Sequence, residues 1–318
     1  MVARMGRYAI VGAGAVGGAI GGTLARAGHA VTLVARGAHL EAIGECGLSL
    51  VTPEGTQTVR TAVLGDARAL PFAQLDAIVI ATKAQDTAAV LEALSAWQGP
   101  LVCAQNGVAN ERLARERFAH VLGVLVFAPL SHLEPGVVTI HAAAPYGGLE
   151  VGRWPAGADA VADVLAADLV AAGWDARAVP DIARWKLGKL LTNLGNVLEA
   201  VGGRAALRPE LLRAIGAEAE ACLSAARLDH ASADDVFARF ASVRELLPRR
   251  GGSTWQSLHR GLPLETDALN GEIVRLGRAH GVATPWNDAL VALSARARTE
   301  RWAPGASSPA ALRALLPP

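Results

Sequence analysis

The feature that most constrains the fold is a glycine pattern near the start of the chain, Gly12-Ala-Gly14-Ala-Val-Gly17. It follows an apolar run at residues 8–12 that predicts a strand, and it opens a predicted helix at residues 15–27. In such a loop the first glycine permits a tight turn, the second lets the backbone approach a pyrophosphate, and the third allows close helix–strand packing. The helix N-terminus adds free N–H groups and a positive dipole for phosphates. The motif arises by chance in Ala- and Gly-rich chains, but this strand–loop–helix context predicts dinucleotide binding.

The first half of the chain continues to alternate β-rich and helical runs. Further strands are expected at residues 30–35, 76–82, 100–105, 121–127 and 137–141, with a helix at residues 87–97. Alternating strands and helices of this kind are typical of a doubly wound parallel sheet.

Beyond Pro180 the pattern changes to long helical runs, at residues 181–200, 209–228, 234–247 and 265–280. We therefore predict an α/β protein with an N-terminal Rossmann-type domain, a doubly wound parallel sheet, over residues 1–178. A second, all-α C-terminal domain is expected over residues 179–318. The stretch 248–257 is predicted to be a polar loop, and the tail from Pro304 a loosely ordered end.

Composition excludes several classes of protein. The 318 residues are 52% hydrophobic, which indicates a folded chain. The formal net charge is +1, so the chain lacks the excess positive charge that would attract nucleic acid or anionic membranes. The run from Tyr8 to Ala27 is too rich in glycine for a good membrane helix, and Arg26 interrupts it. Three scattered cysteines and no His/Cys pairing predict no metal site and fit a reducing, cytoplasmic setting. A homodimer is left open.

The strand at residues 30–35 bears on the choice of cofactor. NAD-binding folds usually place an acidic residue at the end of this strand to bind the ribose 2′-hydroxyl, but here the strand contains no acid and ends at Arg36. An arginine there can pair with a 2′-phosphate, which favours NADPH/NADP⁺, although a solvated surface arginine is the alternative.

Two polar residues follow later strands of the predicted sheet. Lys83 comes after the strand at residues 76–82, and Asn106 after the strand at residues 100–105. Ligands of open α/β sheets bind at the carboxyl ends of strands, so both are candidate cofactor contacts. A surface lysine and an ordinary Asn-Gly turn are the alternatives.

The helical run at residues 184–198 is the most informative part of the second half. On a helical wheel its leucines form one stripe, and a second face gathers only lysine and asparagine: Lys186, Lys189, Asn193 and Asn196. Asparagine weakens a helix interior, so this face favours binding of a carbonyl or carboxylate oxygen over an ordinary wet surface. Ser253 in the glycine-bearing loop and Glu265 near a helix start are further candidates, with a loop hydroxyl and a capping acid as the alternatives.

Together these residues resemble the ketopantoate reductase (2-dehydropantoate 2-reductase) family along nearly the whole chain. The shared features, in order, are the glycine loop, Arg36, Lys83, Asn106-Gly107, Pro135-Gly-Val-Val, Lys189-x-x-x-Asn193, Ser253-x-x-Gln256 and the Glu265 to Gly271 stretch. The resemblance implies NADPH-dependent reduction of a small anionic 2-keto acid, in pantothenate and coenzyme A biosynthesis.

By the same resemblance Lys189 is the general acid, and Glu265 hydrogen-bonds the substrate and helps set the lysine. Asn193 binds substrate, and Ser253 holds the substrate carboxylate. Asn106 and Asn196 are also expected to bind substrate.

The sequence also departs from the family pattern. The family's second helix asparagine stands eight residues after the lysine, whereas here position 197 is Val and Asn196 is seven residues on. Arg250 replaces a usual asparagine, and Trp255 adds bulk, so acids with a second anionic group are also expected as substrates. Two alternatives stay open, a paralogous reductase for another keto or 3-hydroxy acid and a non-catalytic NADPH-binding regulator.

Overall fold

The computed structural model describes residues 5–317, which form two compact units. The first unit takes in the chain up to Gln105, residues 109–185 and residues 237–249, and the second takes in residues 106–108, 186–236 and 250 onward. Three segments thus fall differently from a single cut at residue 178. Residues 237–249 return to the first unit because Phe240 is buried there, stacked on Phe127 at 5.0 Å between ring centroids.

The first unit is built on an eight-stranded sheet in the order β12-β11-β8-β7-β6-β1-β2-β5. Six of these strands, β5-β2-β1-β6-β7-β8, have the parallel 3-2-1-4-5-6 order of dinucleotide-binding folds. The strand order reverses between β1 and β6, which is where such folds bind their ligand. The strands are β1 (Arg7–Val11), β2 (Ala30–Val34), β5 (Ala62–Leu64), β6 (Ala77–Ile80), β7 (Leu101–Cys103), β8 (Val121–Phe127), β11 (Gly148–Arg153) and β12 (Asp175–Ala178).

Two features of this unit differ from the sequence expectation. The sheet is not wholly parallel, because β11 pairs with β8 in the antiparallel sense. The predicted strand at residues 137–141 is present but lies outside the main sheet, in a second sheet of order β4-β3-β10-β9. The strands of that sheet are β3 (Leu48–Thr52), β4 (Gly55–Val59), β9 (Leu130–Ser131) and β10 (Val137–Ile140).

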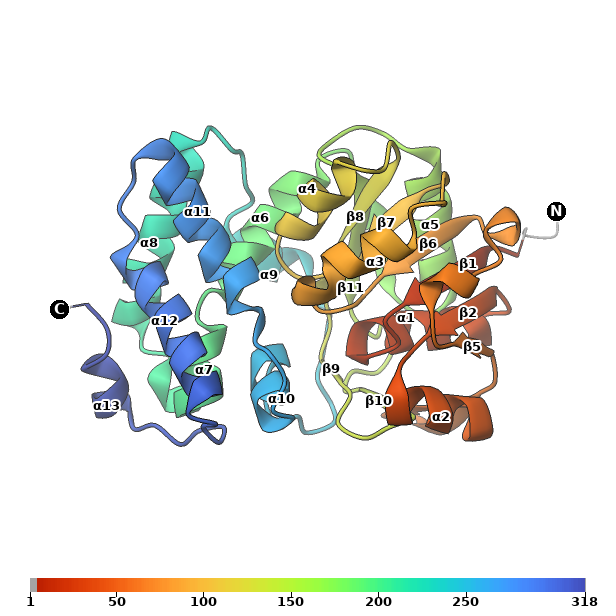
Figure 1. The fold of residues 1–318 in the computed structure, drawn as a ribbon, viewed down its shortest axis with the longest axis horizontal. Helices are drawn as coiled ribbons and strands as arrows, with labels where there is room; N and C mark the ends of the chain where they lie inside the picture. Colours follow the sequence, from red (N-terminus) through yellow and green to blue (C-terminus); the bar gives the residue numbers. More distant parts are fainter. Residues whose placement is uncertain (1–4, 318) are drawn as a thin grey trace. The chain divides into compact units, whose positions relative to one another are not determined.

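Both faces of the main sheet are buried, as the continuous apolar strands predict. Alternate residues of β1 belong to different cores, Tyr8 and Ile10 to one and Ala9 and Val11 to the other. The first core includes residues of α1, α5 and the second sheet, and the other includes residues of α3 and α4 (Figure 1). The helices of this unit are α1 (Ala15–Arg26), α2 (Gly37–Cys46), α3 (Thr87–Ala93), α4 (Ala109–Arg115), α5 (Ala160–Ala171) and the short 3-10 turns η1 (Ala67–Ala69), η2 (Phe72–Gln74) and η3 (Ala84–Asp86).

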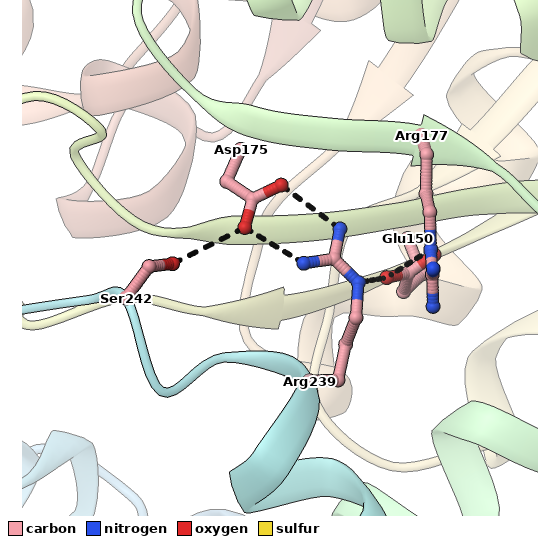
Figure 2. A network of polar contacts seen from close by, with 5 residues as sticks. All are labelled: Glu150, Asp175, Arg177, Arg239 and Ser242. Atoms are coloured by element: carbon pink, nitrogen blue, oxygen red, sulfur yellow. Dashed lines mark hydrogen bonds and ion pairs between the residues drawn. The ribbon is translucent and has the colours of Figure 1, made fainter.

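An ionic network centred on the buried Glu150 fastens residues 237–249 to the edge of this sheet (Figure 2). Arg239 donates to Glu150 of β11 and to both carboxylate oxygens of Asp175 of β12, at 2.7 and 3.0 Å, while Arg177 donates to Glu150 at 2.8 Å. Burial raises the pKa of Glu150 despite its two arginine partners, and the hydrogen bonds from Arg239 lower the pKa of Asp175. The sequence predicted a helix over residues 234–247, but the helix ends at Arg239, where Phe240 packs into the first unit.

The described part of the second unit consists of helices and turns only. The predicted helix at residues 181–200 is interrupted: α6 (Ile182–Asn193) ends and α7 (Asn196–Gly202) begins after two turn residues. Asn270 stabilises this break, because its Nδ2 donates to the Leu194 carbonyl oxygen at 3.1 Å. The remaining helices are η4 (Arg204–Ala206), α8 (Pro209–Ala225), α9 (Ala233–Arg239, which crosses into the first unit), α10 (Ser253–His259), η5 (Glu265–Ala268), α11 (Asn270–His280), α12 (Pro285–Thr299) and α13 (Pro309–Arg313).

Two loop predictions were wrong in part. The stretch 248–257 is a loop only as far as Gly252, because Ser253 begins α10. The tail contains α13, whose first turn is capped by the Ser308 hydroxyl accepting from the Ala311 N–H, and Pro318 lies outside the described residues. None of the helices within residues 5–317 is long and apolar enough to cross a membrane.

Candidate active site

The three glycines of the loop between β1 and α1 meet different surroundings. A Cβ on Gly17 would lie 2.0 Å from the Gly12 carbonyl oxygen, and a Cβ on Gly12 would lie 2.7 Å from the Thr82 backbone nitrogen. Gly12 also has a φ of +100°, a conformation that favours glycine. These two glycines are therefore required by the fold itself.

Gly14 differs from its neighbours because the protein does not crowd it. Among the described residues, the only heavy atom within 4 Å of a Cβ built there, apart from its own chain neighbours, is His132 Cδ2 at 4.0 Å. The space in front of Gly14 faces the start of α1, where this type of loop holds a pyrophosphate. The loop thus fits a dinucleotide.

Lys83 lies beside this loop at the carboxyl end of β6. The preceding residue, Thr82, has a buried hydroxyl with no hydrogen-bond partner in the described part of the chain. A buried hydroxyl without a hydrogen-bond partner, located where the strand order reverses, is the kind of group that a bound ligand would satisfy. Residues 5–317 contain no group of three or more His, Cys, Asp or Glu side chains that could hold a metal ion together.

Arg36 follows β2 directly and precedes α2. Its side chain is 67% exposed and lies 3.8 Å from the carboxylate of Asp86 in η3. An exposed ion pair of this kind contributes little to stability, so Arg36 can release Asp86 for a phosphate at small cost. Asp86 is a competitor that the sequence analysis missed.

In the second unit, Lys189 and Asn193 lie one turn apart on α6, as the spacing predicts. Lys189 Nζ donates to Asn193 Oδ1 at 2.8 Å and to Thr192 Oγ1 at 3.2 Å. Asn193 Nδ2 in turn donates to Asn106 Oδ1 at 3.5 Å. Three of the residues selected from the sequence therefore form one hydrogen-bonded series, although Asn106 stands 87 positions from Asn193.

The two lysines of α6 are in different environments. Lys186 is buried, with 3% of its surface exposed, whereas Lys189 is only partly buried. Close packing holds the helix in this position, because a Cβ on Gly188 would lie 2.5 Å from the Ala231 carbonyl oxygen. Glycine at position 188 thus allows the close approach of the Ala231 backbone.

Glu265 and Asn106 are brought to the same part of the second unit by the turn at Gly107. Gly107 has a φ of +76°, and a Cβ there would lie 2.7 Å from the Ala268 carbonyl oxygen at the end of η5. Glu265, the first residue of η5, is buried. Asn270 has a structural role, since its amide bridges the α6–α7 break and Asn287 of α12.

Asn196 and Ser253 belong to two other helices that pack together, α7 and α10. Because the helix breaks after Asn193, Asn196 starts a new helix and does not continue the polar face of α6. Beside Ser253, a Cβ on Gly252 would lie 3.1 Å from Glu199 Oε2 of α7. Arg250 is exposed at the surface of this loop, and Trp255 stacks on His259 at 5.0 Å between ring centroids.

Several residues near these positions were missed by the sequence analysis: His39, Thr82, Asp86, His132 and Glu199. No local pattern marks them, because each reaches its place through contacts between separate elements. His39, for example, accepts from the Gly136 N–H at 2.8 Å and bonds the Ala13 carbonyl oxygen at 2.7 Å.

Comparison with known proteins assigns this arrangement to a family. The model of "Ketopantoate reductase PanE/ApbA" matches residues 8–156, and that of "Ketopantoate reductase PanE/ApbA C terminal" matches residues 181–297. The chain belongs to the ketopantoate reductase family.

Curated ketopantoate reductases match along almost their full length. The chain is 30% identical to a 2-dehydropantoate 2-reductase of Archaeoglobus fulgidus, with 91% of this chain and 97% of that protein covered. It is 28% identical to the enzyme of the same name from Pyrococcus horikoshii, covering 89% and 95%. The crystal structure of a PanE/ApbA family ketopantoate reductase from Ralstonia eutropha JMP134 is 30% identical, with a TM-score of 0.78 over 93% of this chain and 99% of that one.

Membership of the ketopantoate reductase family confirms the predicted fold class, an N-terminal Rossmann-like part followed by a helical C-terminal part. It also makes the chain an oxidoreductase that depends on a pyridine nucleotide.

Proposed function

We propose that this chain catalyses the NADPH-dependent reduction of 2-dehydropantoate (ketopantoate) to pantoate. The observation that carries the proposal is the hydrogen-bonded series Lys189–Asn193–Asn106, in a chain that matches ketopantoate reductases over nearly its whole length. A helix lysine held by an asparagine is suited to protonate an oxygen that gains negative charge during reduction.

The proposed reaction assigns one task to each side chain. The nicotinamide cofactor, when bound, supplies the hydride that adds to the keto carbon. The Lys189 ammonium gives its proton to the former carbonyl oxygen, so that a 2-hydroxy acid and a neutral amine result. Asn193 Oδ1 accepts from the same ammonium at 2.8 Å and keeps it directed.

The other residues would bind the substrate. Ser253 is proposed to donate to the substrate carboxylate, and Glu265 to hydrogen-bond the substrate and help set Lys189. Asn193, Asn106 and Asn196 would supply further amide groups. Burying a carboxylate requires such donors, because an unpaired buried charge is costly.

NADPH is proposed as the cofactor in preference to NADH. Arg36 supports this choice, because its guanidinium is exposed at the end of β2 and its contact with Asp86 is long, at 3.8 Å. A planar guanidinium matches a 2′-phosphate with two parallel hydrogen bonds. Gly12, Gly14, Gly17, Lys83 and Asn106 complete the proposed cofactor contacts.

Residues 1–178 are assigned the NADP-binding role and residues 179–318 the substrate and catalytic role. A homodimer and a cytoplasmic location stay predictions, the first of which light scattering on the purified chain would check.

The deciding experiment offers a panel of 2-keto acids with NADPH and a panel of 3-hydroxy acids with NADP⁺, and follows the absorbance of NADPH in both. We expect 2-dehydropantoate to be reduced with the highest kcat/KM. A better 2-keto or 3-hydroxy acid would favour a paralogous reductase. NADPH binding without turnover of any acid would favour a nucleotide-binding regulator and overturn the proposal.

A further inference from the structure

Within residues 5–317, and apart from the chain neighbours of Gly14, His132 is the one residue with an atom within 4 Å of a Cβ built on Gly14. Its Cδ2 atom lies 4.0 Å from the position of a Cβ on Gly14. His132 follows β9 and precedes β10 in the second sheet, and only 7% of its surface is exposed. A buried polar side chain therefore lies where the loop would meet the phosphates of a dinucleotide.

The orientation of the His132 ring is fixed by its own hairpin. Its Nδ1 lies 2.9 Å from the Val137 carbonyl oxygen, and since a carbonyl only accepts, Nδ1 carries the proton and donates. Cδ2 and Nε2 form the opposite edge of the imidazole. That edge is the one turned towards Gly14.

His39 packs against the His132 ring. The two ring centroids are 4.2 Å apart. His39 accepts from the Gly136 N–H through Nδ1, so its proton is on Nε2 and is donated to the Ala13 carbonyl oxygen. His39 thereby ties the β9–β10 hairpin to the glycine loop and fixes His132 before any ligand binds.

We propose that His132 is a cofactor-binding residue that donates from Nε2 to the diphosphate of the dinucleotide. The inference rests on the proposed function, because it takes NADPH as the ligand of the loop. A diphosphate offers only acceptor oxygens; because Nδ1 already donates its proton to Val137, Nε2 donates to the diphosphate when a second proton makes the ring an imidazolium. Nε2 belongs to the edge of the ring turned towards Gly14, so it is the ring nitrogen that would reach the phosphates, beside the N–H groups at the start of α1.

The test uses two replacements that each keep one half of the imidazole. His132→Asn places an amide nitrogen near the Nδ1 position and keeps the anchor to Val137, whereas His132→Gln places one near Nε2. Dissociation constants are measured for NADPH and for adenosine 2′-monophosphate, which lacks the diphosphate. Ser131→Ala is the matched control, because the Ser131 hydroxyl lies 2.8 Å from His141 Nε2 and the residue belongs to the same hairpin.

We expect His132→Asn to weaken NADPH binding about tenfold or more, the size of one hydrogen bond to a charged group. His132→Gln should stay within roughly threefold of the parent, by the same conversion of free energy to affinity. Adenosine 2′-monophosphate should bind all variants alike, and Ser131→Ala should bind NADPH as the parent does. Thermal melting of each variant checks that the fold is retained.

Three results would overturn the inference. The first is an NADPH affinity that is unchanged in both His132 variants, and the second is one that falls equally in both. The third is a loss of NADPH affinity matched by an equal loss of affinity for adenosine 2′-monophosphate. A parent chain that does not bind NADPH at all is a different outcome, because it would contradict the proposed function itself.

Discussion

The glycine loop of the first unit and the Lys–Asn helix of the second perform their proposed tasks with different parts of the chain. In the loop the task falls to the backbone, because Gly12 and Gly17 allow close packing and Gly14 leaves room for a ligand. On the helix the task falls to side chains: Lys189 donates to Asn193, and Asn193 donates to Asn106, which lies outside the helix. Changes in the loop should therefore alter folding or cofactor binding, and changes in the helix should alter chemistry while the fold stays intact.

The largest effect is expected within the loop, from Gly17→Ala. Its Cβ would lie 2.0 Å from the Gly12 carbonyl oxygen and 3.0 Å from Ile10 Cγ2, so the loop must move. We expect the free energy of unfolding to fall by about 3 kcal/mol, as for other overpacked sites. Urea unfolding measures it. Gly14→Ala is the control, with open space for its methyl group, and equal destabilisation by both changes would contradict the division of roles.

The next largest effect is expected from Lys189→Ala on turnover. Loss of a general acid lowers kcat by roughly a hundredfold or more, and NADPH binding should be unchanged. Lys186→Ala is the comparison, with turnover expressed per folded molecule because Lys186 is buried. If the Lys186 variant loses more turnover, the proton donor has been assigned one turn too far along the helix.

A smaller effect is expected from Arg36→Asp on the choice of cofactor. Removing the guanidinium should weaken NADPH about tenfold relative to NADH, as one lost charge-assisted pair implies. Titration of both nucleotides measures the ratio. Asp86→Asn removes the competing carboxylate and should shift the ratio slightly towards NADPH. Equal affinity of the parent for the two nucleotides would be incompatible with the assigned role of Arg36.

The smallest effect is expected at the Ser253 loop. Arg250 is exposed, so Arg250→Asn should lower the relative kcat/KM for keto acids with a second carboxylate only about twofold to threefold, because solvent screens surface charge. Glu199→Gln should act in the opposite direction, since that carboxylate lies against Gly252. The ratio of efficiencies for dicarboxylic keto acids against 2-dehydropantoate tests both. An unchanged ratio in the Arg250 variant would make Arg250 an ordinary surface residue.

The two regions also differ in how much of them the sequence predicts. The glycine loop and its flanking strand and helix follow from local pattern, and β1 and α1 form within one residue of the expected bounds. The Lys189–Asn193 pair follows equally from its four-residue spacing. Both are local features, in which neighbours along the chain determine the geometry.

What the sequence does not predict depends on contacts between distant segments. The α6–α7 break is stabilised by Asn270, 76 residues beyond Leu194, and helix α9 ends where Arg239 meets Glu150 and Asp175. The second sheet brings His132 to the glycine loop in the same way. No pattern in a local stretch contains such information, so boundaries and bordering residues were missed where the elements themselves were found.

The most direct test of this division measures two constants on two variants, the dissociation constant of NADPH and the kcat for 2-dehydropantoate at saturating NADPH. We predict that each variant changes one of the two constants and leaves the other unchanged. Gly14→Ala should raise the dissociation constant and leave kcat near that of the parent, while Lys189→Ala should leave the dissociation constant and lower kcat by roughly a hundredfold. If Lys189→Ala instead weakens NADPH binding and leaves kcat unchanged, the assignment of the proton step to the helix is wrong.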